Sequence, residues 1–153
     1  MKSFLKENLI YILVLILAGL IFILWSRVTY GRAINETVCE NLVTLDARAK
    51  CIESFGWEVD ETSETSENVF IPEKFDDVYK RYNKIQKLSG FDLEKYRGKA
   101  VKRYTFRVLN FPDHPKEEVF VNILVYDGKL IGGDCMTVAL DGFMLPLDRR
   151  FID

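Results

Sequence analysis

The chain has 153 residues, a formal net charge of −2 and 48% hydrophobic residues, which leaves room for one domain beside a membrane segment. It holds one histidine and three cysteines without a Cys-x-x-Cys pair, so the ligand set of a zinc or redox-motif site is missing. We therefore expect no metal and no cofactor. The slightly acidic balance weighs against nucleic acid as a partner.

An apolar segment covers residues 9–25, seventeen residues without a charge. As a helix it would be about 26 Å long, close to the ~30 Å hydrocarbon core of a bilayer. It ends in Trp25, Ser26 and Arg27 rather than in the small residues of a signal-peptide cleavage site. These features predict an uncleaved transmembrane anchor, preceded by a short cytoplasmic tail over residues 1–8.

Charge alone does not decide the orientation of this anchor, because Lys2 and Lys6 precede it while Arg27 and Arg32 follow it. A short N-terminal tail and a large C-terminal part are the usual layout of a signal anchor. We therefore expect a single-pass protein of the cell membrane whose C-terminal domain lies outside the cytoplasm.

Two helices are expected after the juxtamembrane segment, residues 26–43. The first ends before Gly56, and its inward face carries Leu45, Ala49, Ile52 and Phe55. The second opens at Pro72 and ends at Gly90. Its apolar stripe, expected to face inward, consists of Phe75, Val78, Tyr79, Tyr82, Ile85 and Leu88.

The remaining pattern is of β type. GWEVD and ENVFIP are predicted to be short extended segments separated by a polar surface loop, residues 61–67. Three long segments follow, KAVKRYTFRVLNF, EVFVNILVY and KLIGGDCMTVAL, and Asp127-Gly128 predicts a two-residue hairpin turn between the last two.

The predicted fold class is α+β: an N-terminal transmembrane helix, then an antiparallel β-meander with two helices packed on one face. GWEVD and NVFIP are expected to extend the sheet. The domain is placed at residues 44–145, and residues 146–153 are expected to form a tail.

The three cysteines allow at most one internal disulfide. Cys39 and Cys51 would be about 18 Å apart on one continuous helix, which is beyond disulfide reach. A bridge therefore needs either Cys135 or a break in the helix before Cys51.

Gly132 and Gly133 are predicted to serve a bulge or a crowded strand crossing, since no helix follows them as a phosphate loop requires. Asp134, if it points inward, needs hydrogen-bond donors, and Arg103 or Tyr104 could supply them. Cys135 is interpreted as a buried structural thiol. His114, in a proline-flanked loop, is expected to be solvated, and no catalytic set is recognised.

The charges are unevenly distributed. Residues 53–77 carry nine acidic side chains and one basic one, whereas residues 80–107 carry ten basic and two acidic ones. Strand alternation places Lys99, Arg103 and Arg107 on one face, where they could meet lipid phosphates or another anionic surface. The favoured alternative is that the acidic and basic lobes neutralise each other across the fold, or that the stripe is the solvated face of an edge strand.

Several short motifs are spread between about Leu45 and Leu145. They include Gly56-Trp57-Glu58-Val59, Ile71-Pro72, Tyr82-Asn83, Gly90-Phe91-Asp92-Leu93, Arg103-Tyr104, Ile131-Gly132-Gly133-Asp134 and Asp141-Gly142-Phe143. In this arrangement the chain resembles domain of unknown function 4830, a family of small, often membrane-anchored proteins of clostridial-type Gram-positive bacteria. The resemblance implies a single extracytoplasmic module and supplies no catalytic residues.

The sequence thus favours a membrane-anchored, non-enzymatic binding or regulatory module. Its expected partners are the membrane itself and an envelope protein or anionic surface. Binding is assigned to Lys99, Arg103, Arg107 and Asp134, and structural turn or bulge roles are assigned to Gly128, Gly132 and Gly133. The alternative is an envelope-acting hydrolase with a site around Asp134.

Overall fold

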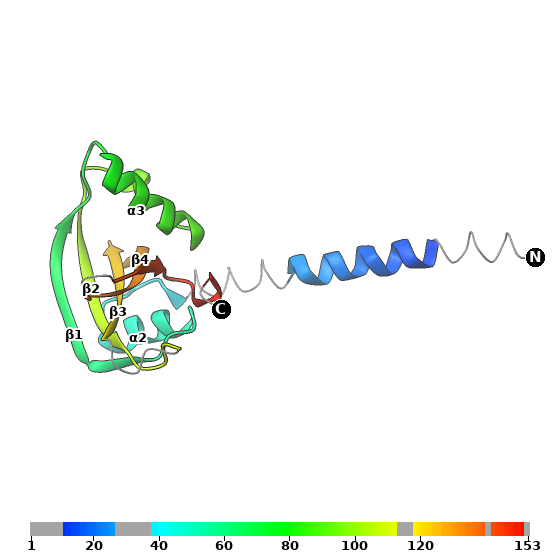
Figure 1. The fold of residues 1–153 in the computed structure, drawn as a ribbon, viewed down its shortest axis with the longest axis horizontal. Coiled ribbons are helices and arrows are strands. Elements are labelled where there is room, and N and C mark those ends of the chain that lie inside the picture. The colour runs from blue at the N-terminus through cyan, green and yellow to red at the C-terminus, as the bar shows by residue number, and fades with distance from the viewer. Residues whose placement is uncertain (1–10, 27–37, 113–117, 140–141, 152–153) are drawn as a thin grey trace, which may run out of the picture. The chain divides into compact units, whose positions relative to one another are not determined.

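The computed structural model describes residues 11–26, 38–112, 118–139 and 142–151, so His114 lies outside the described residues. The chain divides into two compact units, Met1–Thr37 and Val38–Asp153. In the first unit, residues 11–26 form a helix, drawn in blue in Figure 1. No helix among the described residues is both long and apolar enough to cross a membrane. Of the expected transmembrane segment, residues 9–25, the structure describes residues 11–25.

The second unit is an α+β domain built on a five-stranded antiparallel sheet, as the fold class predicts. Its strands follow one another in chain order, β1-β2-β3-β4-β5. The elements are α2 (Leu45–Glu53), β1 (Val59–Phe70), α3 (Asp77–Leu88), the 3-10 helix η1 (Leu93–Tyr96), β2 (Ala100–Val108), β3 (Val119–Tyr126), β4 (Lys129–Thr137), β5 (Met144–Pro146) and the 3-10 helix η2 (Arg149–Phe151).

The central meander of β2, β3 and β4 confirms the three long β segments. Asp127 and Gly128 connect β3 to β4 with φ angles of 49° and 74°. Both turn residues lie in the left-handed region, as a two-residue hairpin with the twist of the flanking strands requires.

The expected loop over residues 61–67 is wrong, because β1 is one continuous strand that pairs with β2. The pairing register shifts between Asp60 and Thr65, where the Asp60 carboxylate accepts hydrogen bonds from the backbone and hydroxyl of Thr62. Beyond this irregularity, Glu67 lies opposite Arg103 on the neighbouring strand. Cross-strand pairing of this kind stabilises a polar strand that local preference alone would leave as a loop.

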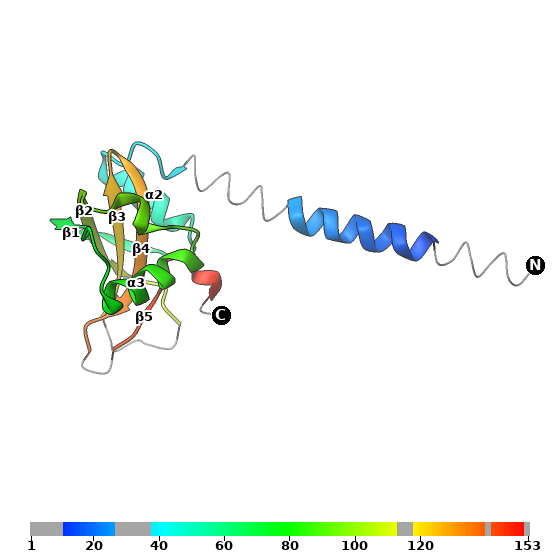
Figure 2. The same cartoon turned by 90° about the horizontal axis from the view of Figure 1, so that it is seen from above.

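The two helices pack on opposite faces of the sheet, not on one face as expected. Figures 1 and 2 show α3 on one side of the central strands and α2 on the other. The α2 side has a core that includes Ile52, Trp57 and Ile123, whereas the α3 side has a separate core that includes Leu93 and Leu124. Because Ile123 and Leu124 are neighbours on β3, they point to opposite faces, and β3 is buried on both.

Helix α3 begins later than predicted, and only part of the predicted stripe faces inward. Asp76 caps it by accepting a hydrogen bond from the Tyr79 N–H. Tyr79 and Tyr82 pack against the core that contains Leu93, as the stripe predicts. The buried positions of the helix are Asn83 and Gln86, whereas Val78 and Leu88 of the stripe are 64% and 54% exposed. The inward face of this helix is therefore both aromatic and polar.

A disulfide joins Cys39 to Cys51, with the two Cα atoms 4.9 Å apart. The bridge is possible because α2 begins only at Leu45, so the chain turns back before the helix. The segment that carries Cys39 is also bonded to the β3–β4 hairpin: the Leu42 N–H donates to the Gly128 carbonyl, and the Leu130 N–H to the Cys39 carbonyl. The helix break, rather than Cys135, is the alternative that the structure realises.

The end of the chain belongs to the domain. The side chain of Leu147 is fully buried, and the Trp57 indole N–H donates to the Leu147 carbonyl at 2.7 Å. Residues 38–43 and 146–153 thus lie in the same compact unit as residues 44–145.

Candidate functional site

Asp134 lies in the middle of β4, directly opposite Asn122 on β3, and its side chain points toward α3. The residue is only 2% exposed. The aspartate therefore points inward beside the two glycines, which the sequence left open.

The carboxylate accepts hydrogen bonds from two neutral side chains. The Tyr82 hydroxyl donates to Oδ2 at 2.8 Å, and the Asn122 amide donates to Oδ1 at 2.8 Å. Thr105 extends the chain of bonds, because its hydroxyl donates to Asn122 Oδ1 at 2.6 Å. These four side chains, Asp134, Asn122, Tyr82 and Thr105, form what we call the Asp134 network.

The donors that the sequence suggested for Asp134 are wrong. Tyr104 points to the α2 face, where the Arg48 guanidinium stacks 4.1 Å from its ring centre. Arg103 pairs with Glu67 on β1 and acts on Asp134 only through its charge. The donors are instead Tyr82 of α3 and Asn122 of the neighbouring strand β3.

Burial sets the proton affinity of the Asp134 network. It raises the pKa of Asp134, and the hydrogen bonds from Asn122 and Tyr82 and the charge of Arg103 counteract this only in part. Burial and the adjacent carboxylate raise the pKa of Tyr82 well above its usual value. The tyrosine therefore stays protonated and remains a donor to the aspartate.

Gln86 continues the polar layer one turn along α3, and the sequence did not predict its role. The oxygen of its side-chain amide accepts a hydrogen bond from the Gly133 N–H at 2.7 Å. Its amide nitrogen is buried without a hydrogen-bond partner among the described residues. The signal in the sequence was that Gln86, an uncharged polar residue, lies one helical turn after Tyr82 of the predicted inward stripe.

Gly132 and Gly133 let α3 and β5 approach β4 closely. A Cβ at Gly132 would lie 2.8 Å from Oε1 of the Gln86 side chain. A Cβ at Gly133 would lie 2.6 Å from the backbone carbonyl oxygen of Asn122. The bulge is at the neighbouring residue: Leu124 pairs with Gly132 and Val125 with Leu130, which leaves Ile131 as the extra residue. Both the crowding and the bulge that the pair predicted are present.

Cys135 follows Asp134 and is fully buried on the opposite face. Burial and the charge of Asp134 raise the pKa of its thiol to about 12. At neutral pH it is therefore protonated, and a protonated thiol is a poor nucleophile.

The predicted basic stripe is divided by the structure. Arg103 and Arg107 lie on β2 and pair with Glu67 and Asp60 on β1. Lys99 precedes the strand and is exposed, and its carbonyl accepts a hydrogen bond from the Ile71 N–H. The two arginines are thus neutralised across the sheet, as the alternative of mutually neutralising lobes predicts.

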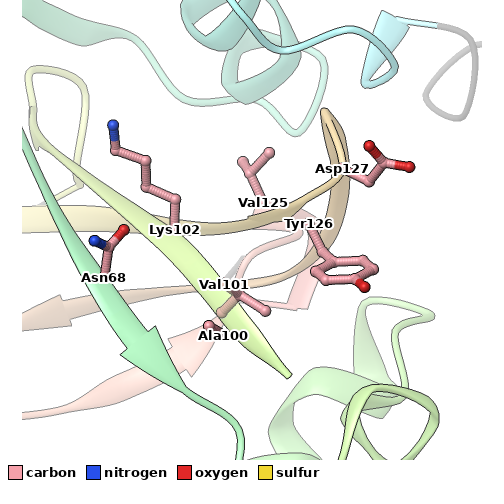
Figure 3. Close-up of a pocket in the computed structure, with 7 residues that line it drawn as sticks. All are labelled: Asn68, Ala100, Val101, Lys102, Val125, Tyr126 and Asp127. Atoms are coloured by element: carbon pink, nitrogen blue, oxygen red, sulfur yellow. The ribbon is translucent and has the colours of Figure 1, made fainter. Parts of the chain in front are cut away.

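An open hollow of about 550 Å³ lies where β1, β2 and β3 come together at one end of the sheet. Its walls include Asn68, Lys102 and Asp127, with Val125 and Tyr126 between them. Figure 3 shows Lys102 and Val125 standing on the same side of the sheet, with Asp127 on the turn beyond. Within the described residues, no group of three or more His, Cys, Asp and Glu side chains is arranged to hold a metal ion.

Comparison with known proteins gives one family. The model of the family described as domain of unknown function (DUF4830) matches residues 51–135, which is more than half of the chain. The match spans α2 to β4 and includes both the Asp134 network and the hollow. No curated protein and no solved structure matches the chain.

Proposed function

The chain belongs to the family of domain of unknown function 4830, and within that family we propose for it the role of a membrane-anchored protein whose extracytoplasmic domain binds a partner. The proposed anchor is the apolar segment of residues 9–25. The proposed partner is a protein of the cell envelope. We propose a binding role in preference to catalysis.

The observation that carries this proposal is the Cys39–Cys51 disulfide. Disulfides persist in oxidising compartments outside the cytoplasm and are rare in the reducing cytosol. This one lies directly after the segment that links the domain to residues 11–26, so it supports a domain held on the outer side of a membrane.

The geometry of the two candidate sites favours binding. The Asp134 carboxylate is not accessible to a substrate, because both of its oxygens accept hydrogen bonds and the residue is 2% exposed. A hydrolase would need that group to reach a substrate or an attacking water. The hollow is open instead, and it presents the Lys102 cation beside the Asn68 amide, groups that suit polar atoms of a polypeptide.

Location is tested on cells that express the full chain. Protease added to protoplasts should degrade the domain, and thiol alkylation without reduction should leave Cys39 and Cys51 unlabelled. Complete protection from protease, or two freely alkylated cysteines, would contradict the proposed location.

Binding is tested by affinity capture from envelope extracts with three forms of the full chain. The wild type and Asp134→Asn should capture the same partner, whereas the double variant Asn68→Ala/Lys102→Ala should lose it. The opposite pattern, with capture or turnover lost only in Asp134→Asn, would favour the hydrolase alternative.

A further inference from the structure

A group of exposed cations lies on α3 and η1. Both elements lie on the same face of the sheet and contribute to the core that contains Leu93. We call the following exposed side chains the basic surface: Lys80, Arg81, Lys84 and Lys87 on α3, Lys95 on η1 and Arg97 at its end.

The acidic segment of residues 53–77, which the structure describes in full, pairs with only one cation of this surface, Lys80, through Asp77. Asp60, Glu64 and Glu67 of β1 are engaged elsewhere, with Arg107, Arg48 and Arg103. Within the described part of the chain, Arg81 and Lys84 make no ion pair. The charge separation seen in the sequence therefore survives folding on this side of the molecule.

The remaining ion pairs of the basic surface are local and exposed. Lys80 pairs with Asp77 within the same helix, and Arg97 pairs with Glu94 three residues away. Lys87 lies 3.5 Å from the partly exposed Asp92 carboxylate. Pairs between exposed side chains are weak in water and break readily when a stronger counter-charge approaches. They leave the cations available to a larger anionic surface.

Apolar side chains accompany the cations on α3. Helical spacing places Arg81, Lys84 and Leu88 on the outward face, opposite the buried Asn83 and Gln86. Leu88 is 54% exposed there. A short row of cations with an exposed leucine is the pattern of helices that lie at the interface of anionic membranes.

We propose that the basic surface docks the domain on a bilayer that contains anionic phospholipids. Phosphodiester headgroups supply the negative charge that Arg81 and Lys84 lack within the protein, and the acyl boundary accepts Leu88. The docking concerns α3 and η1, not the arginines of β2 that the sequence singled out.

The length of the connecting segment favours a membrane over a diffusing acidic partner. Eleven residues separate Ser26 from Val38, and even fully extended they reach only about 40 Å. With residues 9–25 as the anchor, this reach keeps the domain beside the bilayer at high effective concentration. In this respect the inference rests on the proposed anchoring, which the following experiment tests separately.

The test measures lysine acetylation by mass spectrometry on the full chain mixed with liposomes. One preparation contains phosphatidylcholine alone, and the other contains phosphatidylcholine with phosphatidylglycerol. Lys80, Lys84 and Lys87 should be labelled at least about threefold more slowly with the anionic liposomes, and added salt should abolish the difference. Lys50 and Lys129, exposed on α2 and on the β3–β4 hairpin, are internal controls that should not change.

A matched pair of variants checks the assignment. Arg81→Gln/Lys84→Gln should remove the protection of Lys80 and Lys87, whereas Lys50→Gln/Lys129→Gln, which removes the same charge, should keep it. Equal labelling with both liposomes, or equal protection of all lysines, would overturn the docking surface. Flotation with phosphatidylcholine liposomes in high salt reports the anchor alone, so failure of the anchor is distinguishable from failure of the docking surface.

Discussion

The protonation state of Asp134 links one buried side chain to the pH dependence of folding. Its pKa is higher in the folded chain than in the unfolded chain. Its contribution to stability is therefore full below the unfolded pKa of about 3.8 and is lost as the pH rises through the folded pKa. Most carboxylates in folded proteins behave in the opposite way.

We predict that Asp134→Asn is at least as stable as the wild type at neutral pH. The new amide can still accept from Asn122 and can donate to the Tyr82 oxygen, without a buried charge. Urea unfolding at several pH values should show the advantage of the variant shrinking as the pH falls toward 4. Taking the difference from the wild type cancels the titration of Asp60 and Asp92, whose pKa values are lowered. A loss at neutral pH that shrinks as the pH falls would contradict the prediction, because it would mean that the folded chain stabilises the charged carboxylate.

Gly133→Ala should lower the free energy of unfolding by about 1–3 kcal/mol, because the added methyl group meets the Asn122 backbone carbonyl inside a paired strand. Gly132→Ala is the graded comparison. Its methyl group meets the end of the Gln86 side chain, which can move, so a smaller loss is expected. Denaturant titration of both variants measures the two losses, and equal stability of Gly133→Ala and the wild type would contradict the close approach.

At the scale of single residues, the sequence predicted the position of the Asp134 site but not the side chains that donate hydrogen bonds to Asp134. Two glycines before an aspartate predicted crowding around a buried polar group. The donors could not be found in the same way, because Tyr82 and Asp134 are 52 residues apart in the chain. Asn122 lies within the otherwise apolar EVFVNILVY, where its polarity was the only local sign of a partner across the strands.

Among the elements, α2 depends on its covalent link to the segment before it. Closing a loop between Cys39 and Cys51, 12 residues apart, is expected to stabilise the domain by about 3 kcal/mol through the unfolded state. We predict that a reductant lowers the urea midpoint of the wild type. The variant Cys39→Ala/Cys51→Ala should start lower and show no response to the reductant. A response in that variant would point to Cys135 instead.

The elements differ in how far local pattern decided them. The hairpin at Asp127-Gly128 needed only its turn residues. Strand β1 needed its neighbour, because its Asp, Glu and Asn residues have little preference for a strand until cross-strand pairs form. For helix α3 the sequence predicted the helix and part of its inward face, but not the polar part. Asn83 faces inward because it forms hydrogen bonds with Asp92 and Leu93, while Val78 and Leu88 stay exposed.

For the whole molecule, the arrangement of layers was the largest error of prediction. Two amphipathic helices can pack on one face of a sheet as readily as on both faces. Their own apolar patterns therefore do not decide on which face each helix packs. The signal lay in the β3 sequence VFVNILVY, which has too few polar positions for a strand with one solvated face. A strand that is apolar on both sides needs a layer on each.

We predict that the domain requires both ends of its compact unit. The fragment of residues 38–153 should unfold in one cooperative transition. The fragment of residues 38–145 should fail to fold, since it lacks the fully buried Leu147 side chain and the carbonyl that accepts from Trp57. Near-ultraviolet circular dichroism and thermal scans of both fragments decide the matter, and a cooperative transition in the shorter fragment would confine the domain to the predicted boundary.

The Cys39–Cys51 bridge also has a mechanical consequence. A pulling force applied to the N-terminal segment reaches the domain at Cys39, where it would peel the chain from the Gly128 and Leu130 hydrogen bonds as a zipper opens. The bridge diverts that load through the sulfur atoms into the last turn of α2. The segment between the two cysteines, which are 12 positions apart, then cannot lengthen under tension, so reduction should add about 40 Å to the contour length released when the domain is stretched. With the bridge intact, a domain under tension from a tether would therefore not lose this N-terminal segment before the rest of the fold opens.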